Sequence, residues 1–237
     1  MGKWKKWLSA GLFTAMLGTA IIAGPTADVS ANAGNKPYNI ENVSPDAHLA
    51  PSVGDSSSKT SSKAWHKIDG VCYNGSGKKV EGAITRGMDV SEWQGKINWK
   101  EAKKDLDFAF VRISYGTRHL DDYYAYNMTE AEAADVPVGT YVYSLAKTNK
   151  EALAEAQLAI RQMQGHKVSY PVAFDLEDEA TLGTLTRKEI SQIALTFCDE
   201  IRKAGYTPIL YMNLNWYNNF VDWNVLEGSG LDVWIAS

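Results

Sequence analysis

The segment PVAFDLEDEA, residues 171–180, contains both a buried-looking strand and a pair of acids. Its apolar run after the proline is short and rich in residues that favour strands, which predicts a buried β-strand. Side chains alternate between the two faces of a strand, so Asp175 and Glu177 lie on one face, roughly 6 to 7 Å apart at the backbone. Phe174 and Leu176 then point to the opposite face.

Two carboxylates this close repel each other unless a cation or open water compensates their charge. One interpretation is therefore a structural pair that is neutralised or solvated. The other is a functional pair for acid–base or nucleophilic chemistry, of the kind that glycoside hydrolysis requires. The segment by itself leaves both open.

The first 33 residues, 1–33, predict a cleaved secretory signal. A basic start is followed by an apolar stretch over residues 8–24 and by Ala-Asn-Ala at 31–33, the small-residue pattern of a cleavage site. An uncleaved membrane anchor is the alternative, but a stretch of about 17 residues is short for a span. We therefore expect a secreted protein, extracellular or associated with the cell wall, that has no membrane contact once the signal is removed.

Composition argues against several classes of protein. The net charge of −4 from 24 basic and 28 acidic residues gives no basic surface for nucleic acid. The two cysteines, Cys72 and Cys198, could form a bridge after export, but two cysteines define no disulfide framework. The four histidines have no ligand spacing with each other or with cysteine, so we expect no metal and no cofactor.

Two short regions precede the main domain. Residues 34–63 are rich in Ser, Asn, Pro, Lys and Gly, cannot bury enough apolar surface to fold, and are expected to be a disordered linker. Residues 64–82 combine alternating apolar residues with the turn signal NGSG, which predicts a hairpin. This hairpin resembles a single cell-wall-binding repeat of Gram-positive surface proteins; a hairpin docked on the main domain is the alternative.

Residues 83–237 alternate strand and helix patterns. The expected strands are Thr85–Val90, Phe108–Ser114, Pro137–Ser144, Tyr170–Asp175, Thr207–Met212 and Asp232–Ala236. This alternation predicts an α/β fold with a parallel sheet covered by helices, either a barrel or a doubly wound sheet. No phosphate-binding glycine loop follows any strand, which argues against a nucleotide-binding fold.

Three helices have recognisable starts and two have an apolar stripe. Capping spacing occurs at Asn98 with Glu101, Thr148 with Glu151, and Thr186 with Glu189. The expected buried stripes are Leu153, Ala156, Ile160 and Met163 in one helix and Ile190, Ile193, Phe197 and Ile201 in another.

A barrel accounts best for the acids, because the carboxyl ends of its strands share one mouth. The acids expected at this mouth are Asp89, Asp175 and Glu177. The substrate-binding residues expected beside them are Tyr115, Tyr143, Tyr211, Asn213 and Trp234. Acids surrounded by aromatic rings are typical of a polysaccharide site, since sugar rings stack on aromatic faces and their hydroxyls need acceptors.

Six motifs in fixed order strengthen this interpretation: GMDVSEWQG, FVRISYG, VPVGTYVYS, PVAFDLE, PILYMNLNWY and DVWIA. Together they resemble glycoside hydrolase family 25, the Chalaropsis-type lysozymes, over residues 84–237. The resemblance implies a modified TIM-like barrel of the (β/α)5(β)3 type and retaining hydrolysis of the β-1,4 bond from N-acetylmuramic acid to N-acetylglucosamine in peptidoglycan. It also implies that Glu177 is the proton donor, Asp175 its partner carboxylate and Asp89 a further acid.

The chemistry of the pair leaves a choice of mechanism. Glu177 must hold a proton near neutral pH, which burial beside an ionised Asp175 favours. Asp175 can attack the anomeric carbon or orient the substrate's own acetamido group, and the strand spacing does not decide between them. The alternative function is a non-catalytic cell-wall-binding protein, whereas an amidase or peptidase would need a metal or Cys/His site. We expect a monomer.

The sequence ends in LDVWIAS, where the family pattern continues into an eighth strand with another Asp at the mouth. We therefore expect a fragment that lacks the last strand, with unpaired edges on the strands at 85–90 and 232–236. The alternative is a barrel closed by direct pairing of these two strands.

Deleting residues 34–63 is expected to leave the hydrolysis of a soluble glycan fragment unchanged, because a disordered linker contributes no contact to the site. Steady-state rates of the deletion variant and the parent chain test this. A large loss of rate would mean that the segment packs on the barrel.

Overall fold

The computed structural model describes residues 6–9, 66–74, 77–83 and 85–236. For 6–9 and His66 it describes the backbone only. The predicted linker at 34–63 and most of the predicted signal at 1–33 lie outside these residues.

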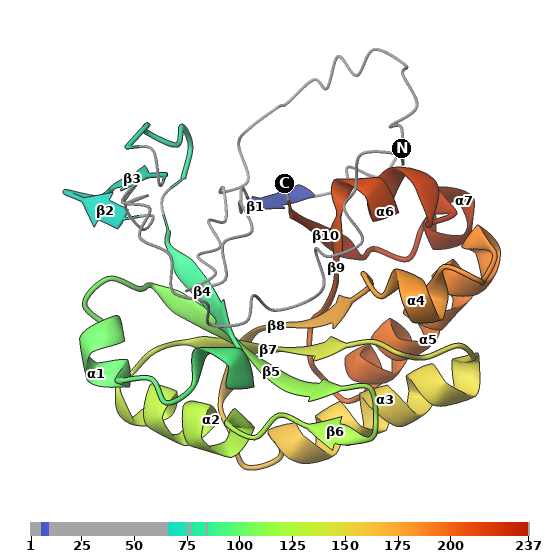
Figure 1. Ribbon diagram of the computed structural model, residues 1–237, viewed down its shortest axis with the longest axis horizontal. Coiled ribbons are helices and arrows are strands. Elements are labelled where there is room, and N and C mark those ends of the chain that lie inside the picture. The colour runs from blue at the N-terminus through green and yellow to red at the C-terminus, as the bar shows by residue number, and fades with distance from the viewer. Residues whose placement is uncertain (1–5, 10–65, 75–76, 84, 237) are drawn as a thin grey trace, which may run out of the picture.

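A curled, mainly parallel sheet forms the centre of the fold (Figure 1). Its strands are β1 (Lys6–Ser9), β4 (Gly87–Val90), β5 (Phe108–Tyr115), β6 (His119–Leu120), β7 (Val138–Tyr143), β8 (Val168–Asp175), β9 (Pro208–Asn213) and β10 (Asp232–Ala236). The order is β1-β10-β9-β8-β7-β5-β4, all parallel, and β6 pairs antiparallel with β5. The six strands expected from the sequence are therefore confirmed, with small shifts at their ends.

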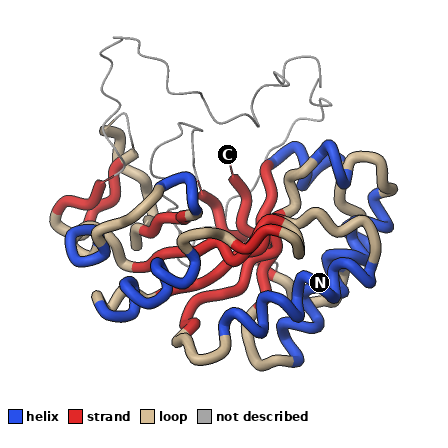
Figure 2. The backbone as a smooth tube through the Cα atoms, turned by 60° about the horizontal axis from the view of Figure 1, so that its bottom comes forward, coloured by secondary structure: helices blue, strands red, loops and turns tan. Residues whose placement is uncertain are grey.

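Helices lie along the outside of the strands (Figure 2). They are α1 (Trp99–Ala102), α2 (Tyr124–Ala133), α3 (Asn149–Met163), α4 (Glu179–Leu182), α5 (Arg187–Lys203), α6 (Leu214–Asn219) and α7 (Trp223–Leu226), with a 3-10 turn η3 (Glu92–Gln94) after β4. The three starts predicted for α1, α3 and α5 are confirmed, since Asn98, Thr148 and Thr186 each accept a hydrogen bond from the backbone three residues on. Sequence reasoning missed the start of α2 because Tyr123, at its N-cap, makes no side-chain cap.

The buried face of α5 is the predicted stripe, but the stripe predicted for α3 is partly wrong. On α3 the fully buried residues are Ala152, Glu155, Ala156, Ala159 and Met163. Leu153 and Ile160 are only half-buried at the margin of this face. The face is rotated because α3 packs closely against α5, and a row of alanines allows that approach.

Alternation along the strands divides the apolar residues between two cores. Outward side chains meet the helices, as where Phe174 stacks on Phe197 of α5 with ring centroids 4.1 Å apart. Inward side chains form a separate aromatic cluster of Phe108, Phe110, Ala173, Ile209 and Trp234, flanked by Tyr141, Tyr170 and Tyr211. The interior of the curled sheet is therefore filled with side chains below the level of the acids.

The N-terminal hairpin packs on the main domain. It consists of β2 (His66–Ile68) and β3 (Val71–Tyr73), joined at Asp69 and Gly70, whose positive φ angles of 49° and 79° fit a tight hairpin turn. Lys67 forms an ion pair with Asp107 at 2.9 Å, and the same carboxylate accepts the backbone N–H of Arg86 at 2.7 Å. These contacts favour the docked hairpin over an independent repeat.

The turn that the sequence indicated at NGSG is a second turn after this hairpin. The Gly77 N–H donates to the Asn74 carbonyl at 2.9 Å, so the chain reverses again there. Sequence reasoning missed the turn at Asp69-Gly70, a dipeptide that also favours tight hairpin turns and that joins β2 to β3.

Both cysteines are buried and both are free thiols. Cys72 packs with Val80 and Ala83 under the hairpin, whereas Cys198 lies in the core on α5. Burial raises the pKa of the Cys198 thiol well above its ordinary value. No bridge joins the hairpin to the helix in this structure.

The two edges of the sheet differ from expectation. We expected β10 to carry an unpaired edge, but that edge pairs in register with β1, from Lys6↔Val233 to Ser9↔Ala236. An open parallel edge presents free N–H and C=O groups that an extended segment can satisfy. Among the described strands, β4 pairs with β5 and forms no ladder with β10, so direct closure between β4 and β10 is absent there.

Within the part of the chain that the structure describes, no helix combines the length and apolar character needed to cross a bilayer.

Replacing Gly139 of β7 by Ala is expected to cost about 1–3 kcal/mol of unfolding free energy. The added Cβ would lie 2.6 Å from the Pro171 carbonyl oxygen and 2.7 Å from the Phe110 ring, so both the β8 backbone and the inner cluster would have to shift. Urea denaturation measures the change. The control is Ser169→Ala at an exposed position of β8, which should remain within about 0.5 kcal/mol of the parent, and equal stability of the two variants would contradict the prediction.

Candidate active site

The three predicted acids lie on the inner face of the sheet, at the carboxyl ends of their strands. Asp89 belongs to β4, Asp175 is the last residue of β8 and Glu177 follows two residues later. Asp175 and Glu177 are only 6% and 7% exposed. One oxygen of each, Asp175 Oδ1 and Glu177 Oε1, is buried and has no hydrogen-bond partner among the described residues.

Strand register sets Asp175 in a row of aromatic residues. Asp175 is the register partner of Tyr143 on β7 and of Tyr211 on β9, and Tyr211 in turn pairs with Trp234 on β10. Register partners on parallel strands face the same side, so these four side chains share the inner face. The structure therefore brings together residues that are far apart in the sequence.

Burial raises the pKa of all three acids. For Asp89 the pKa rises to about 6. For Glu177 burial and then the Asp89 charge raise the pKa to about 7, although hydrogen bonds from Asn213 oppose the rise. For Asp175 burial comes first, followed by the charges of Glu177 and Asp89, and together they outweigh the favourable charge of Arg112.

The raised pKa of Asp175 differs from the expectation that this residue alone stays charged. Asp175 and Glu177 are both buried and interact electrostatically, so their two carboxyl groups titrate as a linked pair. Arg112 is the cation that favours charge on Asp175.

Asn213 is held in one orientation at the end of β9. Its side-chain oxygen accepts the Trp216 backbone N–H at 3.0 Å and so caps α6. The amide nitrogen is then directed to Glu177, which receives hydrogen bonds from both the side chain and the backbone of Asn213. This predicted residue therefore contacts the acid directly.

Tyr115 and Tyr143 form a stacked pair at the mouth, with ring centroids 4.8 Å apart and an interplanar angle of 16°. Asp178, immediately after Glu177, accepts hydrogen bonds from both hydroxyl groups, at 3.1 Å from Tyr115 and 3.5 Å from Tyr143. The other oxygen of Asp178 accepts the Thr181 N–H at 2.7 Å and starts α4. Sequence reasoning found the tyrosines but missed the carboxylate that fixes them.

Trp234 has a different place from the one expected of a substrate-binding residue. It is 4% exposed and packs edge-on against Tyr211 at 4.8 Å and tilted against Phe110 at 4.9 Å. Its indole nitrogen has no partner among the described residues. Trp234 therefore forms part of the floor beneath the acids.

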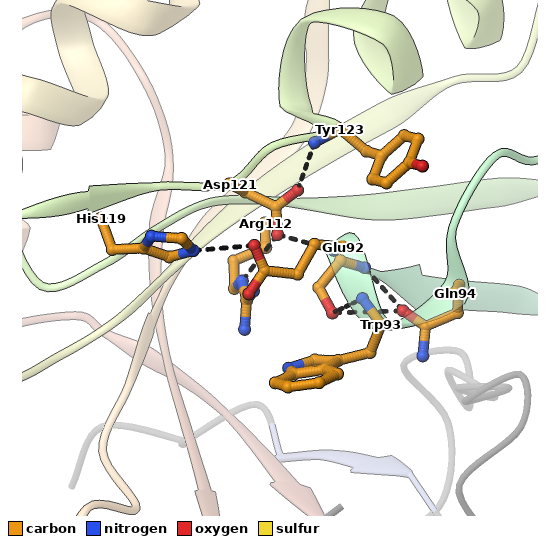
Figure 3. A network of polar contacts seen from close by, with 8 residues as sticks. Glu92, Trp93, Gln94, Arg112, His119, Asp121 and Tyr123 are labelled. Atoms are coloured by element: carbon orange, nitrogen blue, oxygen red, sulfur yellow. Dashed lines mark hydrogen bonds and ion pairs between the residues drawn. The ribbon is translucent and has the colours of Figure 1, made fainter. Parts of the chain in front are cut away.

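A buried ionic network was also missed by sequence reasoning. Arg112 of β5 donates from Nε to Asp121 at 2.8 Å and pairs through its terminal nitrogen with Glu92 at 2.9 Å. Glu92 also contacts His119 Nε2 at 2.7 Å, as Figure 3 shows. The signal was available, because Arg112 is the only charged residue in the apolar run 108–115 and alternates in step with Phe108 and Phe110.

Glu155 supports the turn that follows Tyr143. Its carboxylate is 2% exposed and accepts hydrogen bonds from Ser144 Oγ at 2.8 Å and from the Leu145 N–H at 3.0 Å. Burial raises its pKa to about 7, although both hydrogen bonds oppose the rise. Among the residues that the structure describes, no three His, Cys, Asp or Glu side chains are placed to hold a metal ion.

Comparison with known proteins agrees with this geometry. The chain is 38% identical to Lysozyme M1 of Streptomyces globisporus over 60 residues, 25% of this chain and 20% of that protein. The solved family 25 glycosyl hydrolase of Bacillus anthracis has a TM-score of 0.55 and 24% identity, covering 64% of this chain and 69% of that one. The autolysin LytC of Streptococcus pneumoniae, solved with a synthetic peptidoglycan ligand, has a TM-score of 0.58 and 23% identity. The match covers 73% of this chain and 43% of that one.

These structures share the fold with this chain, and the chain spans about half the length of the first curated relatives it matches. The sequence model of the glycosyl hydrolases family 25 matches residues 88–237, from β4 through β10, and so includes every acid and aromatic residue of the site. Because this match covers more than half of the chain, the protein belongs to glycosyl hydrolase family 25.

Proposed function

We propose that this protein is a muramidase that hydrolyses the β-1,4 bond between N-acetylmuramic acid and N-acetylglucosamine in peptidoglycan, with retention of configuration. The observation that carries the proposal is the pair Asp175 and Glu177, buried at the mouth of the sheet with one unpartnered oxygen each. Family membership and the similarity to a lysozyme and to an autolysin solved with a synthetic peptidoglycan ligand support the same substrate.

In this mechanism Glu177 gives its proton to the glycosidic oxygen as the bond from that oxygen to the anomeric carbon breaks. Burial and Asp89 raise the pKa of Glu177 to about 7, so the carboxyl group is available as an acid at neutral pH. The Asn213 amide orients the carboxyl group at the end of β9.

Asp175 stabilises the positive charge that develops at the anomeric carbon. That charge favours the ionised form of Asp175. The proton of the linked pair is therefore held by Glu177 as the glycosidic bond begins to break. The new bond to carbon comes from Asp175 itself or from the substrate's acetamido oxygen, which Asp175 would orient. Water then attacks the anomeric carbon and gives its proton to Glu177, restoring both groups and the original configuration.

Asp89 has a supporting role. Its charge raises the pKa of both other acids, and it lies on β4 across the inner face from β8. We infer that Asp89 helps keep one proton on the pair and contacts the substrate at the mouth.

The remaining features of the proposal rest on the sequence. The signal pattern at 1–33 supports a secreted protein acting at the cell wall, and cleavage there would remove β1 from the edge of β10. The family resemblance supports a barrel of the (β/α)5(β)3 type. We propose that the enzyme acts as a monomer. The alternative is a non-catalytic protein that binds cell walls. It would be supported if the protein bound purified walls but released no new reducing ends.

Replacing Glu177 by Gln is expected to lower kcat at least 100-fold, because it removes the transferable proton while keeping the shape of the side chain. Release of reducing ends from purified cell walls measures the rate. Asp89→Asn should cost less, about tenfold.

The matched control is Glu179→Gln, the same chemical change at an exposed position two residues further on, which should keep the parent rate. A Glu177→Gln protein that clears walls near the parent rate would refute the assignment of the acid.

The raised pKa values also predict that the fold loses stability as pH rises. Glu177 has an ordinary value of 4.5 and a folded value of about 7, so its stabilising contribution is fully present below pH 4.5 and is lost as pH rises through about 7. The loss from this group is on the order of 1–3 kcal/mol. Glu155 adds a parallel loss with the same sign.

Urea unfolding at pH 4.5 to 8 tests this linkage. Glu177→Gln should flatten part of the decline and leave the part due to Glu155, whereas Glu179→Gln should follow the parent curve. A Glu177→Gln variant with the full parental decline would contradict the raised pKa.

A further inference from the structure

The large apolar side chains that remain exposed gather at one end of the sheet. Among the described residues the five exposed ones are Ile68, Trp93, Tyr115, Leu120 and Leu214. All but Ile68 lie at the carboxyl ends of the parallel strands: Trp93 follows β4, Tyr115 ends β5, Leu120 of β6 pairs with Ser114 near that end of β5, and Leu214 follows β9. They therefore surround the mouth where the acids lie.

Trp93 is the most exposed of these residues, with 70% of its surface open to solvent. Its indole therefore presents a broad, flat apolar face to solvent, a surface that suits a planar apolar partner. It lies in η3, four residues after the proposed site residue Asp89.

The turn that carries Trp93 is held from two directions. The Ser91 N–H donates to Gln94 Oε1 at 2.7 Å, and the Ser91 side-chain oxygen accepts the Trp93 N–H at 3.4 Å, so Ser91 and Gln94 form a capping box around Trp93. The Glu92 N–H donates to Asp121 Oδ2 at 2.8 Å. The backbone on both sides of the indole is thus fixed.

The side chain of Glu92 adds an ionic anchor. It joins Arg112 at 2.9 Å and His119 at 2.7 Å, while Asp121, fully buried, pairs with Arg112 from the other side. Figure 3 shows the Trp93 indole on the side of the turn away from Asp121. An ionic network that is buried at Arg112 and Asp121 holds the turn, while its largest side chain stays in water; such an arrangement presents that side chain to a ligand.

We propose that Trp93 is a stacking residue for a sugar of the glycan strand away from the scissile bond, and that the Arg112–Asp121–Glu92–His119 network positions it. This inference rests on the proposed function and extends it. The enzyme then favours an extended peptidoglycan strand over a fragment too short to occupy both the acids and Trp93. The partner is the apolar face of a pyranose ring.

The test compares two substrates, long soluble glycan strands and a tetrasaccharide of the same repeat, for Trp93→Ala, Trp93→Phe and the parent. Trp93→Ala should raise KM for the long strands about tenfold, with a much smaller change for the tetrasaccharide and for kcat, because stacking contributes to binding. Trp93→Phe keeps an aromatic face and should recover most of the affinity.

Ile68→Ala is the matched control, since it removes an exposed apolar side chain from the hairpin, outside the mouth, and should leave both substrates unaffected. Gln94→Ala loosens the turn without removing the indole and should shift KM for the long strands in the same direction, by about threefold.

Equal losses on both substrates, no loss with Trp93→Ala, or no rescue by Trp93→Phe would each overturn the proposal. A fall in the unfolding midpoint of Trp93→Ala well below that of Ile68→Ala would also overturn it, because the indole would then be part of the fold. If Glu177→Gln remains active, the proposed function fails instead, so the two failures are distinguishable.

Discussion

The alternation of side chains along β8 is the constraint on which the site depends. Phe174 and Leu176 are drawn outward into the core beneath the helices, which obliges Asp175 and Glu177 to point inward. A shift of one residue would expose the outer core and bury the acids against the helices, so burial of the outer face fixes the orientation of the pair. The chemistry of the mouth is therefore set by the packing of the opposite face.

Burial of three acids around one mouth has an energetic cost that the rest of the structure offsets only in part. Arg112 supplies positive charge near Asp175. Because Asp121 and Glu92 already form ion pairs with Arg112, its charge does not neutralise Asp175 fully. The pKa values of the acids consequently rise. The same imbalance that lowers stability near neutral pH keeps a proton available for transfer, which is a common relation between strain and activity.

The residues around the acids are organised by hydrogen bonds between a side chain and the start of a helix or turn. Asn213 caps α6 while its amide reaches Glu177, and Asp178 caps α4 while it holds two tyrosine hydroxyls. Each of these side chains thus ties the end of a strand to the element that follows it. The site is rigid because its polar groups have structural as well as chemical roles.

The sequence by itself determined most of the secondary structure and the shared orientation of two acids. Runs of β-branched and aromatic residues predicted the six main strands, capping residues predicted three helix starts, and the spacing of Asp175 and Glu177 placed both acids on one face. These features are local, so residues near each other in the chain specify them. Where local signals are weak, the sequence-based predictions failed. The start of α2 was missed because it has no side-chain cap, and the buried face of α3 was placed incorrectly because its alanines form no strongly apolar stripe.

Only the tertiary structure decided how strands far apart in the chain are aligned. Register put Tyr143, Asp175, Tyr211 and Trp234 on one face of the sheet. Packing of the inner cluster buried Trp234, whereas the turn after β4 left Trp93 in water. The tertiary structure also brought Arg112 to Asp121 and Glu92, and covered the edge of β10 with β1 rather than leaving it open. Such contacts depend on the curvature of the sheet and on the packing of whole elements, which no short stretch of sequence contains.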